Sequence, residues 1–193
     1  MATTVTVLGK IQPLLTIPED FTRITSEPRS RNGEAVRVDR YQQRRPVQWF
    51  GPHVTLVWGN DDRLLSFNAF TATSSAPLPT QLAARQIAMQ VWQALDPSYA
   101  AGLDYMRTDR LTRSFEGDNQ HVDIPVWWVK FAHRNGSYNW VSVGAGGQVV
   151  EMERESMWDY MRSRRATEEW NYDDWVLARE DQGPQPAAPA ALA

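Results

Sequence analysis

The three histidines are the first residues to consider for metal chemistry, because imidazole is a common ligand of metal ions. His121 and Asp123 are separated by one residue, and His133 follows in the next predicted strand. A metal site needs three or four converging ligands, and this spacing matches no known ligand pattern. The chain has no cysteine, which excludes thiolate sites and a thiol nucleophile. The sequence therefore predicts no metal and no cofactor.

Carboxylates that act as general acids or bases need a cleft that shifts their pKa values. Asp61 and Asp62 are adjacent, but they lie in a predicted turn, where Asp is favoured for backbone reasons. Glu151 and Glu153 share one face of a predicted strand, and this face and the acidic stretch at 168–174 are expected to be solvated. No nucleophile elbow, P-loop or dinucleotide fingerprint is present. No catalytic residue is predicted.

Arginines gather between residues 29 and 45 and again between 162 and 165. The planar guanidinium suits carboxylate and phosphate groups, so these clusters could form an anion-binding patch. The alternative is pairing within the chain, with the acidic stretch near the C-terminus. The overall charge favours this pairing, because Lys+Arg is 20, Asp+Glu is 23 and the net charge is −3. Because the chain lacks the excess of Lys and Arg that is typical of nucleic-acid binders, no nucleic-acid partner is expected.

Nine tryptophans are the most unusual feature of the composition. Trp127 and Trp128 are adjacent on a predicted strand, so their side chains point to opposite faces of a sheet. One of the two needs a cover, and the Trp-rich segment at 158–177 is predicted to fold back over that second face. The alternative is an aromatic platform for a peptide, a sugar or a partner protein. The candidate binding surface consists of Trp49, Trp58, Trp128, His133, Tyr138 and Trp140.

Apolar periodicity and turn residues predict the elements that position these side chains. Helical spacing of apolar residues, with Thr80 as N-cap, predicts a helix over 81–95. Asn135-Gly136 and the glycines at 144–147 predict tight hairpins, so Gly136 and at least one of the later glycines are expected at positive φ. Residues 156–165 are predicted to form a short helix. Strands are predicted at 35–41, 53–58, 64–70, 103–115, 126–133, 138–143 and 149–153.

The predicted elements fall into four parts of the chain. These are an N-terminal β-rich unit (1–73), a helix with an antiparallel sheet (79–155), a Trp-rich helical cover (156–182) and a disordered tail (183–193). Residues 53–68 align without a gap onto 138–153, which places Phe67 on Met152. The alignment predicts an internal repeat, and chance matching of two similar meanders is the alternative.

The second part of the chain resembles the PepSY-like domains. Residues 131–144 (FAHRNGSYNWVSVG) carry most of the likeness, and the match extends over 80–153, with 20–71 as a weaker copy. The resemblance implies one helix against a curled antiparallel sheet, in a cystatin-like arrangement. It also implies a protein that binds or restrains peptidases rather than a catalyst.

The sequence as a whole predicts an α+β fold of two antiparallel β-meander, PepSY/cystatin-like units with a central helix and a C-terminal helical segment. The expected function is a non-catalytic protein- or peptide-binding module, as a monomer or as a homodimer through a sheet edge. The alternative is a small enzyme or ligand carrier that uses the concave face of the sheet, near His133, Tyr138 and Trp140. No apolar run reaches the roughly 20 residues of a membrane span, and residues 1–15 lack the apolar core of a signal peptide. A cytoplasmic protein is expected, although a chain trimmed of an export leader would look the same.

Overall fold

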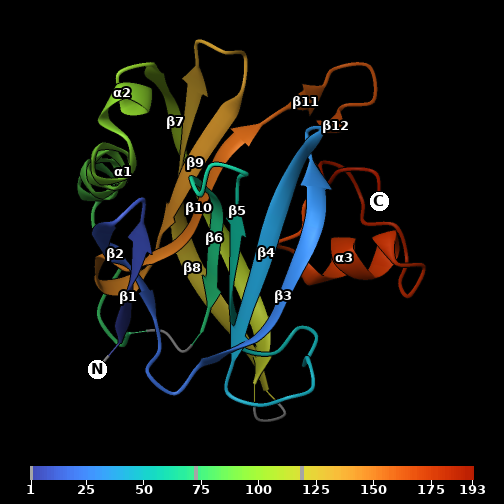
Figure 1. Cartoon of the computed structure of the whole chain (residues 1–193). Helices are drawn as coiled ribbons and strands as arrows, with labels where there is room; N and C mark the ends of the chain where they lie inside the picture. The colour runs from blue at the N-terminus through green and yellow to red at the C-terminus, as the bar shows by residue number, and fades with distance from the viewer. Residues whose placement is uncertain (1, 72–73, 118–119) are drawn as a thin grey trace.

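The computed structural model describes residues 2–71, 74–117 and 120–193. Within these residues, one antiparallel sheet of eight strands dominates, in the order β3-β4-β5-β6-β10-β9-β8-β7 (Figure 1). The strands are β1 (Thr3–Val7), β2 (Lys10–Ile17), β3 (Thr22–Arg31), β4 (Glu34–Gln42), β5 (His53–Trp58), β6 (Leu64–Phe70), β7 (Leu103–Gly117), β8 (Gln120–His133), β9 (Tyr138–Val143), β10 (Val149–Ser156), β11 (Trp158–Asp159) and β12 (Arg164–Arg165). The helices are α1 (Gln81–Leu95), α2 (Pro97–Ala100) and α3 (Asp173–Arg179), with a 3-10 turn at Ala145–Gly147.

The predicted α+β fold of two antiparallel β-meander, PepSY/cystatin-like units with a central helix is wrong, because the fold is mostly β and has one eight-stranded sheet. The meanders β3–β6 and β7–β10 join edge to edge in one continuous sheet, where β6 pairs with β10 through Phe67 and Met152. Helix α1 lies against one face of this sheet (Figure 1). The alternation of apolar and polar residues along a strand predicts which side chains share a face of the sheet. It does not predict which strands, far apart in the sequence, pair with each other.

Several local elements agree with the sequence prediction. Helix α1 begins and ends where expected, and the Thr80 hydroxyl accepts a hydrogen bond from the backbone N–H of Ala83 at 3.2 Å. Gly136, Gly146 and Gly147 have φ values of 86°, 63° and 82°, which confirms the predicted positive φ in both turns. These features depend on neighbouring residues alone, which explains why the sequence was sufficient for them.

The first face of the sheet is closed by an apolar core. The β1–β2 hairpin and α1 both pack on this face, and their apolar side chains form one cluster with those of the sheet. Ala88, Val91 and Trp92 of α1 are buried, and Trp127 packs against the cluster while its indole N–H donates to the carbonyl of Pro79. This face therefore contains the larger hydrophobic core of the described residues.

The second face of the sheet is covered by the C-terminal segment 157–193 (Figure 1). Trp170 packs against apolar residues of β4–β6, and Trp175 is 1% exposed in a cluster with Val176. The predicted helix at 156–165 is wrong, because this stretch forms the short pair β11–β12 and the turn between them. The apolar residues Met157 and Met161 are exposed, so no buried helical face exists there.

The last residues, predicted as a disordered tail, also pack against the cover. Ala191 is 2% exposed, its N–H donates to a carboxylate oxygen of Glu169, and the carbonyl of Pro189 accepts from the N–H of Arg165. A segment made mostly of Pro and Ala has no apolar periodicity, so its sequence alone does not predict whether it packs against the fold.

A chain that ends at Gln182 is expected to lose about 1–2 kcal/mol of stability, which is a fall in Tm of about 3–6 °C. The reason is that the buried carboxylate of Glu169 loses the N–H of Ala191. Thermal unfolding followed by circular dichroism measures the change, and Leu192→Ala, at an exposed position, is the matched control. A truncated chain that melts with the full chain would show that this contact is not stabilising.

Candidate functional site

A row of buried polar side chains crosses the second face of the sheet. Cross-strand pairing places them side by side, from β3 through β4, β5, β6 and β10 to β9. The row consists of Thr25, Arg40, Thr55, Asn68, Glu151 and Ser142. Five of the six are buried, and two of these five, Arg40 and Glu151, carry charges that are seldom buried unless they are paired.

Three consecutive residues of the C-terminal segment supply partners for this row. The Asn68 side chain donates to the backbone carbonyl of Asn171 and accepts from the Asn171 side-chain amide. Tyr172 donates its hydroxyl proton to Glu151 at 2.7 Å, and Asp173 binds Arg40 through both carboxylate oxygens at 2.5 and 2.9 Å. The predicted pairing of arginines with the acidic C-terminal stretch is confirmed by this contact. The prediction of a solvated acidic stretch is wrong for Asp173, which is 7% exposed.

Glu151 is the most deeply buried ionisable group of the row, at 0% exposed. It accepts hydrogen bonds from Arg113 Nε at 2.8 Å and from the hydroxyl groups of Ser142 and Tyr172. Burial by itself would raise the pKa of Glu151, but the positive charge of Arg113 and these hydrogen bonds hold that pKa below its ordinary value. The predicted solvated face for Glu151 and Glu153 is therefore wrong, because the cover lies on it.

A cavity of about 350 Å³ lies beside the row, between β7, the loop before β5 and the cover. Its lining consists of Phe50, His53, Phe70, Thr112, Arg113, Ser114, Tyr172, Asp173 and Asp174. His53 Nδ1 lies 2.8 Å from the carbonyl of Gly51, an acceptor, so Nδ1 carries the proton. Burial, together with the charge of Arg40, lowers the pKa of His53 to about 4. The imidazole is therefore neutral at pH 7.

The edge strand β7 is open along its outer side next to this cavity. The Thr108 carbonyl accepts a hydrogen bond from the Gln81 side chain, and the Glu116 N–H donates to the Phe50 carbonyl. Neither contact is with β8, so the backbone N–H and C=O groups of the even-numbered residues in this stretch point outward, away from β8. Arg110, Thr112 and Ser114, between these two positions, have no hydrogen-bond partner on that side among the described residues. The opening therefore runs over the middle of a 15-residue strand.

The opposite edge of the sheet, strand β3, is protected. Pro28 lies in the middle of the strand and has no N–H to offer. The indole N–H of Trp170 donates to the carbonyl of Ser30 at 2.7 Å, and the Arg45 side chain donates to the carbonyl of Arg23. These are the devices by which natural proteins prevent strand addition at an edge. Of the two edges, β7 is the accessible one.

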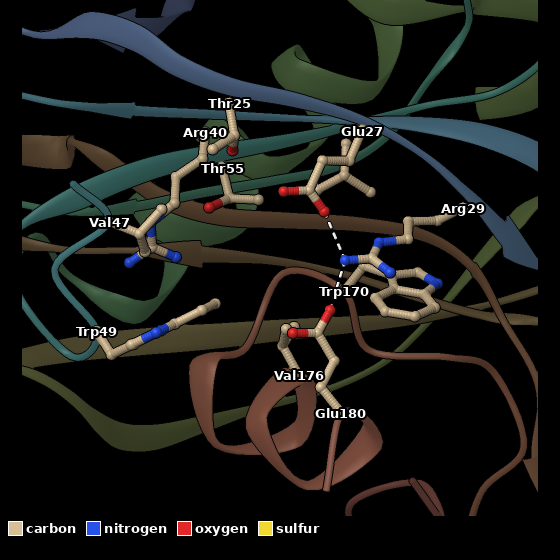
Figure 2. A pocket seen from close by; sticks show the side chains of 11 residues that line it. Thr25, Glu27, Arg29, Arg40, Val47, Trp49, Thr55, Trp170, Val176 and Glu180 are labelled. Atoms are coloured by element: carbon tan, nitrogen blue, oxygen red, sulfur yellow. Dashed lines mark hydrogen bonds and ion pairs between the residues drawn. The ribbon is translucent and has the colours of Figure 1, made fainter. Parts of the chain in front are cut away.

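The six residues of the predicted binding surface lie in several places. Trp49 lines a small cavity beside Arg40 (Figure 2). Trp128 and Trp140 are buried, and their ring centres are 5.7 Å apart. The ammonium group of Lys130 lies over the rings of both Trp128 and Tyr138, which places Tyr138 next to this pair.

The other two predicted residues lie elsewhere. Trp58 belongs to the apolar core of the first face, and the His133 ring stacks on Tyr99 at 4.0 Å. His133, Tyr138 and Trp140 line neither of the cavities described here. Sequence reasoning missed Arg113, His53 and the β7 edge, because an exposed edge strand and a paired one have the same alternating pattern.

In the described part of the chain, no helix combines the length and the apolar character that crossing a membrane requires. We compared the chain with protein-family models, with curated proteins and with solved structures, and none of the three comparisons found a match.

Proposed function

We propose that the protein is a non-catalytic binding module that takes an extended peptide segment of a partner protein as an additional strand on β7. The observation that carries the proposal is the row of outward backbone groups at Arg110, Thr112 and Ser114. Strand addition uses such groups for affinity, and pockets next to the edge for specificity. The partner's segment would continue the antiparallel sheet as a ninth strand.

The cavity next to this edge supports a specificity role. Thr112 and Ser114 of the edge lie on its wall, and Phe50 and Phe70 give it an aromatic lining. Its volume of about 350 Å³ is at the small end of ligand sites, which suits one side chain of a bound segment rather than a cofactor. Because Phe50 and Phe70 form part of the wall and His53 is neutral at pH 7, we propose that the accepted side chain is apolar.

The internal repeat, which stays a prediction, would make the two edge strands of the sheet equivalent. If β3–β6 and β7–β10 are copies, then β3 and β7 are equivalent edge strands. Phe67 and Met152, aligned by sequence, face each other at the pairing of β6 with β10, as a twofold axis there would require. Pro28 and the contact from Trp170 close the β3 edge. On β7, which has no proline, the corresponding side-chain contact, from Gln81, reaches the Thr108 carbonyl and leaves the stretch from Arg110 to Ser114 open.

The PepSY-like resemblance, also a prediction, implies a peptidase as the class of partner. An extended segment near a peptidase active site would be the part that β7 binds. A homodimer through the same edge is the competing occupant, because two β7 strands could pair with each other.

The test uses peptides selected from a displayed random library on the full chain, then measured against two proline variants. Thr112→Pro removes an outward N–H from β7 and is expected to weaken binding at least about tenfold, since it removes a backbone hydrogen bond and disturbs the edge. Ser30→Pro, on the protected edge β3, is the matched control and should leave binding unchanged. Equal affinity of both variants would contradict the proposal, and a concentration-dependent dimer that Thr112→Pro abolishes would assign the edge to a second copy.

A further inference from the structure

A second, smaller cavity is lined by Arg40, the ion-pair partner of Asp173, which lines the first cavity. It has a volume of about 80 Å³. Figure 2 shows Thr25, Arg40 and Thr55 on the side of the sheet, with Trp49, Trp170 and Val176 on the side of the loop and the cover. Arg29 lies at one end of the cavity, held between Glu27 and Glu180 at 2.5 Å from each (Figure 2).

Two residues that line this cavity each have a buried polar atom without a partner. Within the described residues, Arg40 Nε and the Thr55 hydroxyl are buried without a hydrogen bond. Arg40 and Thr55 are direct cross-strand neighbours, and the two residues are 6% and 2% exposed. The neighbouring members of the polar row, Asn68 and Glu151, are both satisfied. Among the members of the polar row, the buried groups without a partner are therefore the two at the place where the row meets the cavity.

The guanidinium of Arg40 is fixed in place by its other two nitrogens. They bind Asp173 through both carboxylate oxygens and the carbonyl of Gln48 at 3.2 Å, and the guanidinium carbon lies 5.2 Å from the ring centre of Trp49. The Nε–H group is thus a rigid donor that cannot turn to another partner. Thr55 can donate or accept, because its hydroxyl rotates.

The charges around the cavity indicate which ligand it takes. Asp173 neutralises Arg40, and Arg29 is shared by two carboxylates, so one negative charge is in excess and anions are disfavoured. A cation without an acceptor would leave Arg40 Nε–H unpaired. The two indole walls and the valines favour an apolar body. The matching ligand is small and uncharged, with one acceptor oxygen.

We propose that this cavity binds a small uncharged molecule whose carbonyl or hydroxyl oxygen accepts hydrogen bonds from Arg40 Nε and the Thr55 hydroxyl. A cavity of this volume holds two or three water molecules, so a body of about four or five heavy atoms fills it. The site is separate from the β7 edge, and either one can fail without the other.

The experiment compares acetamide with acetate, which have the same shape and differ in charge. Indole N–H resonances of Trp49 and Trp170 are followed by NMR while each compound is added to the full chain. Acetamide is expected to shift both resonances, with an affinity of about millimolar or weaker, and acetate at equal concentration is expected to shift neither. This comparison needs no variant and therefore does not depend on the folding of one.

A pair of variants assigns the contact. Thr55→Val removes the hydroxyl with little change in shape and should weaken acetamide binding about fivefold, the loss of one hydrogen bond. Ser66→Ala, which removes another buried hydroxyl without a partner in the described structure, lies outside the cavity and should leave binding unchanged. Absence of shifts with acetamide would mean a cavity that holds water only. That result, equal shifts with acetate, or equal affinity in Thr55→Val would each overturn the proposal.

Discussion

Replacing Arg113 with methionine is expected to lower the free energy of unfolding by about 3–5 kcal/mol. Arg113 supplies the positive charge that faces Glu151, and Glu151 is completely buried. Methionine has nearly the same reach but leaves the carboxylate, among the residues that the structure describes, with two neutral hydroxyl donors, Ser142 and Tyr172. An uncompensated buried charge is among the few single changes that cost this much. Urea unfolding at pH 7 measures the loss.

Two further measurements identify the buried charge as the cause. The double variant Arg113→Met with Glu151→Met is expected to be more stable than Arg113→Met alone, since it removes the unpaired carboxylate as well. Losing Arg113 also raises the pKa of Glu151, because the positive charge no longer opposes the effect of burial. The destabilisation should therefore shrink as the pH falls below the new pKa. A double variant less stable than the single one would reject this explanation.

The second large effect concerns pH and His53. Burial lowers the pKa of this imidazole to about 4 from an ordinary value of 6.5, so the unfolded chain binds the proton more readily than the folded one. The contribution of His53 to stability is complete above pH 6.5 and is lost as the pH falls toward 4. A shift of this size corresponds to about 3 kcal/mol, of which about 2 kcal/mol are lost by pH 5.

The comparison that isolates this effect uses His53→Phe, which keeps a ring against Phe70 and cannot titrate. The wild type should lose stability between pH 6.5 and 5, and His53→Phe should lose much less over the same range. His121→Gln is the control, because His121 is exposed and is bonded to Glu116. Identical pH slopes for wild type and His53→Phe would contradict the assignment.

The sequence was a good guide to elements whose cause is local. Helix α1, its Thr80 cap and the turn at Gly136 follow from the conformational preferences of a few adjacent residues, and all three are present. The opposite directions of Trp127 and Trp128 also follow from strand geometry alone: Trp127 packs with the apolar core of the first face, and Trp128 packs against Trp140.

The sequence was a poor guide where the burial of a residue depends on a distant segment that packs on it. Glu151 and Glu153 alternate with apolar residues as solvated positions do, but a segment more than a dozen residues further along the chain lies on them and supplies Asn171 and Tyr172 as partners. The predicted helix at 156–165 failed for a related reason, because the apolar residues Met157 and Met161 suggested a buried face where the structure has a turn.

By itself, the sequence determined helix α1 and the turns at Gly136 and at 144–147, and it favoured the pairing of arginines with carboxylates inside the chain. Dihedral preferences act between near neighbours, and charge balance is a property of the whole composition. Only the tertiary structure decided that two meanders form one sheet, that β3 is a protected edge and β7 an open one, and that Arg40 and Thr55 meet at a cavity. The physical reason is that strand pairing and burial are properties of surfaces in contact. Neither property is present in a chain until distant segments have met.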